Sequence, residues 1–253
     1  MTRPDDAHSR PYIFRGEGTG KLQAFLWGVG RVFFQFIAVL LFHIRIWARE
    51  NVPGKGPALL VTNHQSMLDP WLIGIALKRQ IHYMARESLF RGGIIQYLFE
   101  LTNAFPIRRG RADSSAIREA LDRLAKGYLV NIFPEATRTA DGSIGAVAAG
   151  VAIIVRRAKV PVIPVVLEGA YEAWPRGHRL PRASPIRIRY GKPIQYSELE
   201  NLSPDDIAIR IRRELIALQH QLRSPHAIQS ETRMQADLQA GRKRLVVARE
   251  LAE

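Results

Sequence analysis

Cysteine is absent from this chain of 253 residues. Its absence excludes disulfide bonds, thiolate-bound zinc, iron–sulfur clusters and a cysteine nucleophile. The seven histidines do not have the spacing of metal ligands, and the chain contains neither an intact phosphate loop nor an intact serine nucleophile elbow. The sequence therefore predicts no metal site and no bound cofactor.

Acidic residues are few relative to basic ones. The chain has 37 Lys and Arg against 23 Asp and Glu, which gives a formal net charge of +14. Such a surplus predicts an anionic partner, either nucleic acid, an anionic lipid surface or a phosphorylated substrate. A nucleic-acid surface interleaves basic residues with exposed aromatic ones. Here the aromatic residues cluster in one apolar segment, residues 22–47, so we expect no nucleic-acid partner.

That segment contains the longest apolar run, residues 22–42, in which 16 of 21 residues are apolar. Arg31 lies near its middle, where a charge disfavours a simple membrane span. Aromatic and basic residues on an apolar helix are typical of a membrane interface, although a transmembrane span and a buried core helix also fit. We expect a membrane-associating helical segment over residues 21–50, after a loose arm of residues 1–20. The lack of disulfides fits a reducing compartment, so the expected location is the cytoplasmic face of a membrane.

Residues 51–223 alternate short apolar runs with amphipathic segments. The runs predict strands over residues 58–63, 81–85, 104–107, 128–133, 162–167 and 186–190. The amphipathic segments predict helices over residues 70–78, 94–101, 113–126, 147–157 and 203–222. This order predicts one α/β domain with a mostly parallel sheet flanked by helices. Residues 224–253 are expected to form a charged helical tail.

A histidine and a carboxylate follow the first of these strands. His64 comes directly after the apolar run, and Asp69 lies five residues further on, before Pro70. A carboxylate on Nδ1 would fix the imidazole tautomer and let Nε2 act as a general base. Asp69 followed by Pro70 also fits an ordinary helix N-cap, and the two roles are compatible.

Two further polar clusters follow other strands. Arg108 lies in Phe-Pro-Ile-Arg-Arg, and Glu135, Thr137 and Arg138 lie in Phe-Pro-Glu-Ala-Thr-Arg. Guanidinium groups bind phosphate bidentately. Each cluster alone fits a charged surface loop, but the carboxyl ends of parallel strands meet at one edge of a sheet. We therefore expect all three clusters to form one site.

Four blocks of this sequence resemble the glycerolipid acyltransferases of the lysophosphatidic acid acyltransferase type. They are NHQSMLD at 63–69, FPIRR at 105–109, FPEATR at 133–138 and VPVIPVVLEG at 160–169, in the order of that family. The resemblance implies transfer of an acyl group from acyl-CoA or acyl-carrier protein to the hydroxyl of a lysolipid, foremost 1-acylglycerol 3-phosphate, giving phosphatidic acid. Two departures bear on the head group: Ala136 replaces the usual glycine, and residues 147–150 lack the basic residue of Phe-Lys-x-Gly.

The expected mechanism uses His64 as the general base and Asp69 as its support, without an acyl-enzyme. Arg108, Thr137 and Arg138 would position the polar head group, and Glu135 would bind an arginine or a glycerol hydroxyl. The expected partners are the lysolipid, the acyl thioester, an anionic membrane surface and an acyl-carrier protein where this replaces CoA. Alternatives left open are glycerol 3-phosphate or another lysolipid, such as a lyso-ornithine lipid, as acceptor, and a non-catalytic membrane lipid-binding protein.

Overall fold

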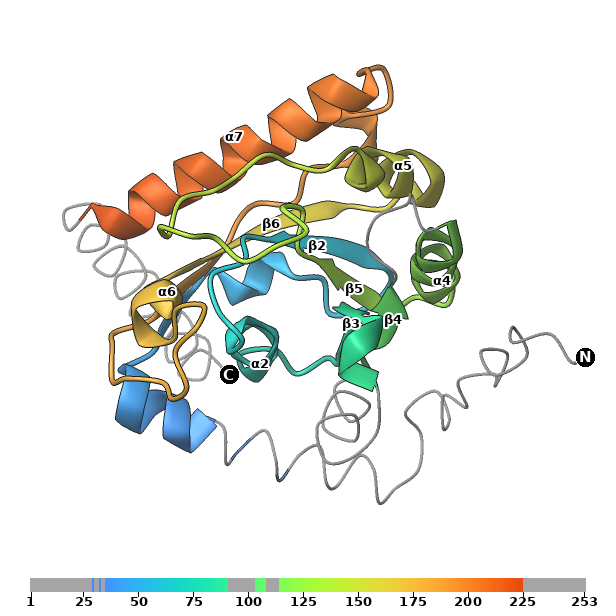
Figure 1. The fold of residues 1–253 in the computed structure, drawn as a ribbon. Coiled ribbons are helices and arrows are strands. Elements are labelled where there is room, and N and C mark those ends of the chain that lie inside the picture. The colour runs from blue at the N-terminus through green and yellow to red at the C-terminus, as the bar shows by residue number, and fades with distance from the viewer. Residues whose placement is uncertain (1–28, 30–31, 33–34, 91–102, 108–113, 225–253) are drawn as a thin grey trace, which may run out of the picture.

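A seven-stranded sheet between two layers of helices forms the molecule (Figure 1). The computed structural model describes residues 29, 32, 35–90, 103–107 and 114–224. The strands are β1 (Arg45–Trp47), β2 (Ala58–Thr62), β3 (Ile81–Arg86), β4 (Phe105–Ile107), β5 (Leu129–Ile132), β6 (Val162–Glu168) and β7 (Arg187–Tyr190). The helices are α2 (Asp69–Ile75), α4 (Ser114–Ala125), α5 (Ala149–Ala158), α6 (Ala170–Ala173) and α7 (Pro204–Arg223), with short 3₁₀ turns at Arg49–Asn51, Glu87–Phe90 and Tyr196–Glu198.

The strands are ordered β1-β7-β6-β2-β5-β3-β4 across the sheet. All neighbouring pairs among these strands are parallel except β6 with β7. The expected α/β fold with a mostly parallel sheet is therefore confirmed. Because β2 lies between β5 and β6 and is parallel to both, the segments that follow these three strands emerge at the same edge of the sheet.

Apolar side chains cover both faces of the sheet. In β2, Leu59 and Val61 pack on the side of α4, α5 and α7, while Ala58 and Leu60 pack on the side of α2, α6 and residues 35–42. Figure 1 shows the same two layers, with α7 and α5 on one side and α2 and α6 on the other. Burial on both faces explains why the strand is an unbroken apolar run instead of an alternating one.

The long helix α7 is fixed by its sequence at both its start and its buried face. Ser203 caps it by accepting the N–H of Asp206, and Pro204 occupies the first turn, where its missing N–H costs nothing. Residues three and four apart form the buried stripe, which consists of Ile207, Ile211, Leu215, Leu218 and Leu222. One polar side chain, Gln219, is buried beside this stripe.

The segment of residues 21–50, expected to be helical throughout, contains a strand near its end in the structure. Its described helix ends at Phe42, His43 has a φ of 40°, and Arg45–Trp47 forms β1 at the edge of the sheet. A left-handed residue cannot continue an α-helix, which is the physical reason for the break. Residues 1–20, the predicted helix 94–101 and the predicted tail 224–253 lie outside the described residues, except Ser224. Within the described part, no helix has the length and hydropathy for crossing a membrane.

Candidate active site

His64 and Asp69 lie within hydrogen-bonding distance after β2. His64 Nδ1 is 2.8 Å from Asp69 Oδ2, and Asp69 is fully buried. The same Oδ2 accepts the backbone N–H of Gln65 at 2.6 Å and of Ser66 at 2.8 Å. The carboxylate therefore holds both the imidazole and the turn that carries it. The additional N-cap role expected of Asp69 is wrong, because Leu68 is the N-cap of α2 and Asp69 is already the first helical residue.

The imidazole of His64 is fixed in position but remains partly accessible to solvent. Its ring stacks on Phe133 with centroids 4.0 Å apart and planes at 21°, and 16% of the side chain stays exposed. The backbone is fixed as well, since the carbonyl of His64 accepts the N–H of Thr139 at 2.8 Å. With Nδ1 directed at Asp69, Nε2 is the nitrogen left for a substrate proton.

Glu135 joins the site through the backbone. Its Oε1 accepts the N–H of His64 at 3.1 Å, and its Oε2 accepts the N–H of Gly145 at 3.2 Å. Burial raises the pKa of Glu135, and these two N–H bonds oppose the rise. These two backbone donors are contacts that the sequence did not predict, and the expected contact of Glu135 with an arginine or a glycerol hydroxyl stays a prediction. A positioning role fits this geometry, because the carboxylate ties the loop after β5 to the histidine.

Thr137 and Arg138 follow in the same loop. Thr137 is exposed and Arg138 is half-buried, and the next residue, Thr139, binds the carbonyl of His64. Ala136 has a φ of 56°, the left-handed conformation in which glycine is favoured. The replacement of the usual glycine by Ala136 therefore falls at a position where the backbone does have a positive φ. Arg108 follows β4 directly but lies outside the described residues.

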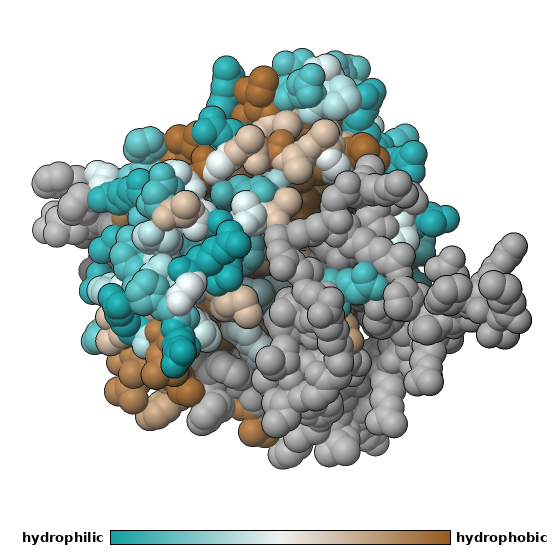
Figure 2. Space-filling view, in the orientation of Figure 1, coloured by the Kyte–Doolittle hydropathy of each residue, from teal (hydrophilic) through white to brown (hydrophobic). Residues whose placement is uncertain are grey.

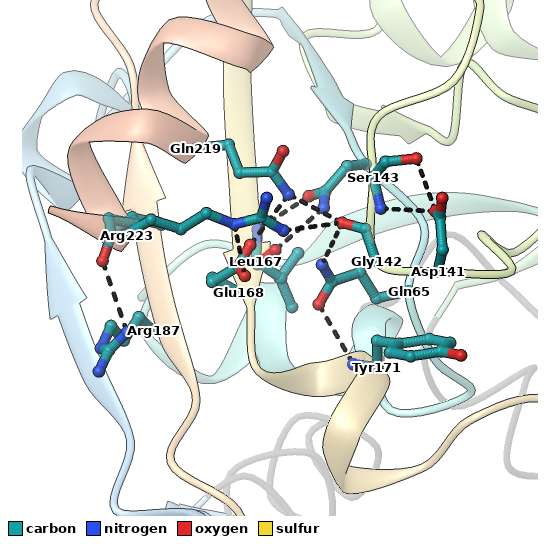
Figure 3. A network of polar contacts seen from close by, with 12 residues as sticks. Gln65, Asp141, Gly142, Ser143, Leu167, Glu168, Tyr171, Arg187, Gln219 and Arg223 are labelled. Atoms are coloured by element: carbon teal, nitrogen blue, oxygen red, sulfur yellow. Dashed lines mark hydrogen bonds and ion pairs between the residues drawn. The ribbon is translucent and has the colours of Figure 1, made fainter.

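A buried polar network that was not predicted from the sequence holds the loop at Gly142 (Figure 3). The carbonyl of Gly142 accepts three side-chain N–H donors, from Gln65 at 3.2 Å, Gln219 at 2.9 Å and Arg223 at 3.2 Å. Gln65 also accepts the first N–H groups of α6 through its Oε1. The one available signal was a glutamine, Gln219, beside the apolar stripe of α7.

Asn63 is the second residue that was missed. Its side chain donates to the carbonyl of Leu167 at 2.9 Å and accepts the N–H of Leu167 at 2.8 Å. This pair of bonds imitates a backbone ladder and extends the contact between β2 and β6 by one residue. The backbone just before His64 is therefore anchored at the carboxyl edge of the sheet.

Comparison with known proteins identifies the family. A family model described as Acyltransferase matches residues 43–168, about half of the chain. This range contains His64, Asp69 and the loop from Glu135 to Gly145. The chain belongs to the acyltransferase family. The predictions of the family and of an acyltransferase enzyme are thereby confirmed.

Named relatives of this acyltransferase share one description. The chain is 27% identical over 160 residues to a 1-acyl-sn-glycerol-3-phosphate acyltransferase of Bacillus subtilis, covering 63% of this chain and 77% of that protein. It is 29% identical over 184 residues to the chloroplastic LPAT1 of Arabidopsis thaliana, covering 68% and 51%. It is 28% identical over 188 residues to the human alpha enzyme, covering 70% and 65%. The chain thus spans most of the bacterial relative and about half of the plant one.

A solved structure matches the fold of this acyltransferase. The 1-acyl-sn-glycerophosphate acyltransferase PlsC of Thermotoga maritima superposes with a TM-score of 0.63 at 24% identity, covering 78% of this chain and 82% of that one. At this identity the likeness shows the fold.

Proposed function

We propose that this acyltransferase transfers a fatty acyl group from an acyl thioester to the free hydroxyl of 1-acylglycerol 3-phosphate, forming phosphatidic acid. The names of the bacterial, plant and human relatives support this acceptor. The observation that carries the chemistry is the 2.8 Å contact between His64 Nδ1 and Asp69 Oδ2 at the carboxyl edge of a parallel sheet. It leaves Nε2 as a base beside the place where such sheets bind ligands.

The reaction is a direct transfer. His64 Nε2 takes the proton of the acceptor hydroxyl as its oxygen attacks the thioester carbonyl carbon, and the charge moves onto the carbonyl oxygen. The carbon–sulfur bond then breaks, and the leaving thiolate takes the proton from the imidazolium. Asp69 keeps the ring oriented and stabilises its positive charge while it exists. No acyl-enzyme is required.

The head group of the acceptor is assigned to the loops that end β4 and β5. Arg108 and Arg138 would bind the phosphate, because guanidinium groups pair with phosphate oxygens through two parallel hydrogen bonds. Thr137, which is exposed beside Arg138, would add a hydroxyl contact. Glu135 acts as a positioning residue through the backbone of His64 and Gly145.

The donor is acyl-CoA or an acylated carrier protein, and the reaction needs no metal or other cofactor. We also propose that the protein attaches to the cytoplasmic face of an anionic membrane through the segment of residues 21–50. Because residues 45–47 form β1, the attachment is assigned to the part of this segment that ends at Phe42. The exposed apolar side chains of Phe36, Val39 and Leu40 support this attachment.

The test is acyl transfer by wild type and His64→Ala. Labelled acyl-CoA and acyl-carrier protein are offered with lysophosphatidate, glycerol 3-phosphate and a lyso-ornithine lipid, and mass spectrometry identifies the lipid product. Wild type should form phosphatidic acid, and the rate of transfer by His64→Ala should be about 10²–10⁴-fold lower. His220→Ala, which removes an exposed imidazole on α7, is the matched control and should act like wild type. Rapid transfer by His64→Ala contradicts the mechanism, and product from another acceptor alone contradicts the substrate.

A further inference from the structure

The loop between α6 and β7 exposes a cationic and apolar surface. Arg176, Arg179 and Arg182 are all exposed, and Leu180, which lies between them, is 77% exposed. Among the described residues, none of these three arginines forms a salt bridge. Packing among the described residues thus accounts for neither the leucine nor the guanidinium groups at this surface.

The loop has a defined conformation. Trp174 Nε1 donates to the carbonyl of His178 at 2.8 Å, and the N–H of Arg182 donates to the carbonyl of Ala173 at 2.7 Å. The end of the loop also packs against Gly169, the residue before α6, because a Cβ there would lie 2.0 Å from the carbonyl oxygen of Pro185. The backbone that carries the three arginines is therefore already ordered, so binding through them would cost little additional backbone entropy.

The loop lies beside the apolar helix of residues 35–42 (Figure 1). The N–H of Ile186, at the end of the loop, donates to the carbonyl of Phe42 at 2.8 Å. The same helix exposes Phe36 by 66% and Leu40 by 63%. Figure 2 shows the result as hydrophobic atoms next to hydrophilic ones at the lower left of the molecule. One end of the protein thus presents apolar and cationic groups together.

This end of the molecule is also linked to the active site. The hydroxyl of Ser66 donates to the carbonyl of Trp174 at 3.2 Å, and the N–H of Ser66 binds Asp69. Met67, the next residue, is 37% exposed. The loop is therefore joined by a hydrogen bond to the segment that carries the histidine.

We propose that residues 176–182 are a second bilayer-binding element, which acts together with the exposed face of residues 35–42. The three arginines bind the phosphates of anionic lipid head groups, and Leu180 enters the boundary with the acyl chains. Cations at this depth are attracted by an anionic leaflet, and exposed apolar side chains gain from leaving water. The proposal rests on the membrane attachment proposed above and adds a site far away in the sequence. It places the lipid surface beside the segment that carries His64.

The test measures partition of the full chain onto sedimented vesicles at physiological salt, without turnover. The vesicles contain phosphatidylcholine alone or phosphatidylcholine with phosphatidylglycerol. The test variant replaces the three loop arginines by glutamine, and the control removes the same charge from exposed arginines of α5 and α7; the substitutions are Arg176→Gln, Arg179→Gln and Arg182→Gln against Arg156→Gln, Arg157→Gln and Arg213→Gln. We expect a loss of about fivefold per arginine on anionic vesicles, and about 100-fold for the triple variant. The control should stay within about twofold of wild type, because charges beyond a Debye length of about 8 Å are screened.

Two further variants separate the parts of the proposal. Leu180→Ser should weaken binding to both kinds of vesicle by about tenfold. His64→Ala should bind vesicles like wild type, so a failure of the proposed chemistry is distinguishable from a failure of this surface. Wild-type affinity in the triple variant, or equal losses in test and control variants, overturns the proposal. If wild type forms a dimer in the absence of vesicles and the triple variant is a monomer, the surface is an interface with a second copy of the chain. That outcome overturns the proposal as well.

Discussion

Replacing Asp69 by Asn removes one charge from the centre of the site and little else. Asp69 Oδ2 accepts three N–H donors, while Oδ1 is buried without a hydrogen-bond partner within the described part of the chain. An asparagine can place its single oxygen toward the three donors and its NH₂ where Oδ1 was. The orientation of His64 should therefore survive, and the negative charge beside it should be lost.

The size of the effect follows from the contact. Two unit charges about 4 Å apart at an effective dielectric constant of about 20 attract by about 4 kcal/mol. This attraction develops only when His64 has taken the proton, so losing it raises the barrier and lowers kcat by about 10³. KM should change little, because the uncharged ring binds in the same place.

The assay can follow the released CoA thiol with a thiol-reactive dye, since the chain has no cysteine that would react. Asp122→Asn, an exposed position on α4, is the matched control and should retain wild-type kcat. If Asp69→Asn stays within tenfold of wild type while His64→Ala is inactive, charge stabilisation by Asp69 is refuted.

Four other outcomes follow from the geometry. Glu135→Gln turns an NH₂ group toward one of two backbone donors and should cost about 1–3 kcal/mol of unfolding free energy, measured by urea, and should lower kcat; full activity would refute the positioning role. Ala136→Gly relieves the φ of 56° and should raise the free energy of unfolding by about 1 kcal/mol, or about 2–4 °C in Tm; a lower Tm would refute it. Arg138→Ala should raise KM for a phosphorylated acceptor more than it lowers kcat, and unchanged kinetics would remove this role. Burial lowers the pKa of His82 to about 3, so the unfolded chain binds more protons than the folded chain between pH 6.5 and about 3. Stability should therefore fall toward acid across this range by up to about 1.4 kcal/mol per pH unit, and His82→Gln should flatten this slope in urea titrations at several pH values.

The fold was predictable because its strands and helices differ strongly in pattern. Buried strands such as β2 and β6 read as short apolar runs, and amphipathic helices such as α7 show the helical period. The exception is β1, a strand of three residues, Arg45–Trp47, directly after an apolar helix. Three residues are too few to show an alternation, and what makes them a strand is pairing with β7, far away in sequence.

The site was predictable where side chains meet side chains near each other in sequence. His64 and Asp69 are five residues apart, and the turn that brings them together is short enough to infer. The two contacts of Glu135 could not be predicted, because its partners are the backbone N–H groups of His64 and Gly145, and every residue except proline carries such a group. A backbone donor leaves no trace in the composition of a sequence.

The network around Gly142 could not be predicted from the sequence because it depends on a backbone conformation. Gly142 has a φ of 81° and is buried, so its carbonyl needs donors from elsewhere in the chain. Gln65 supplies one from beside the histidine, and Gln219 and Arg223 supply two from the end of α7. Because the same loop continues to Gly145, which binds Glu135, the last turns of α7 help to set the position of His64. The proposed acyl transfer should therefore depend on a helix that contributes no residue to the proposed reaction.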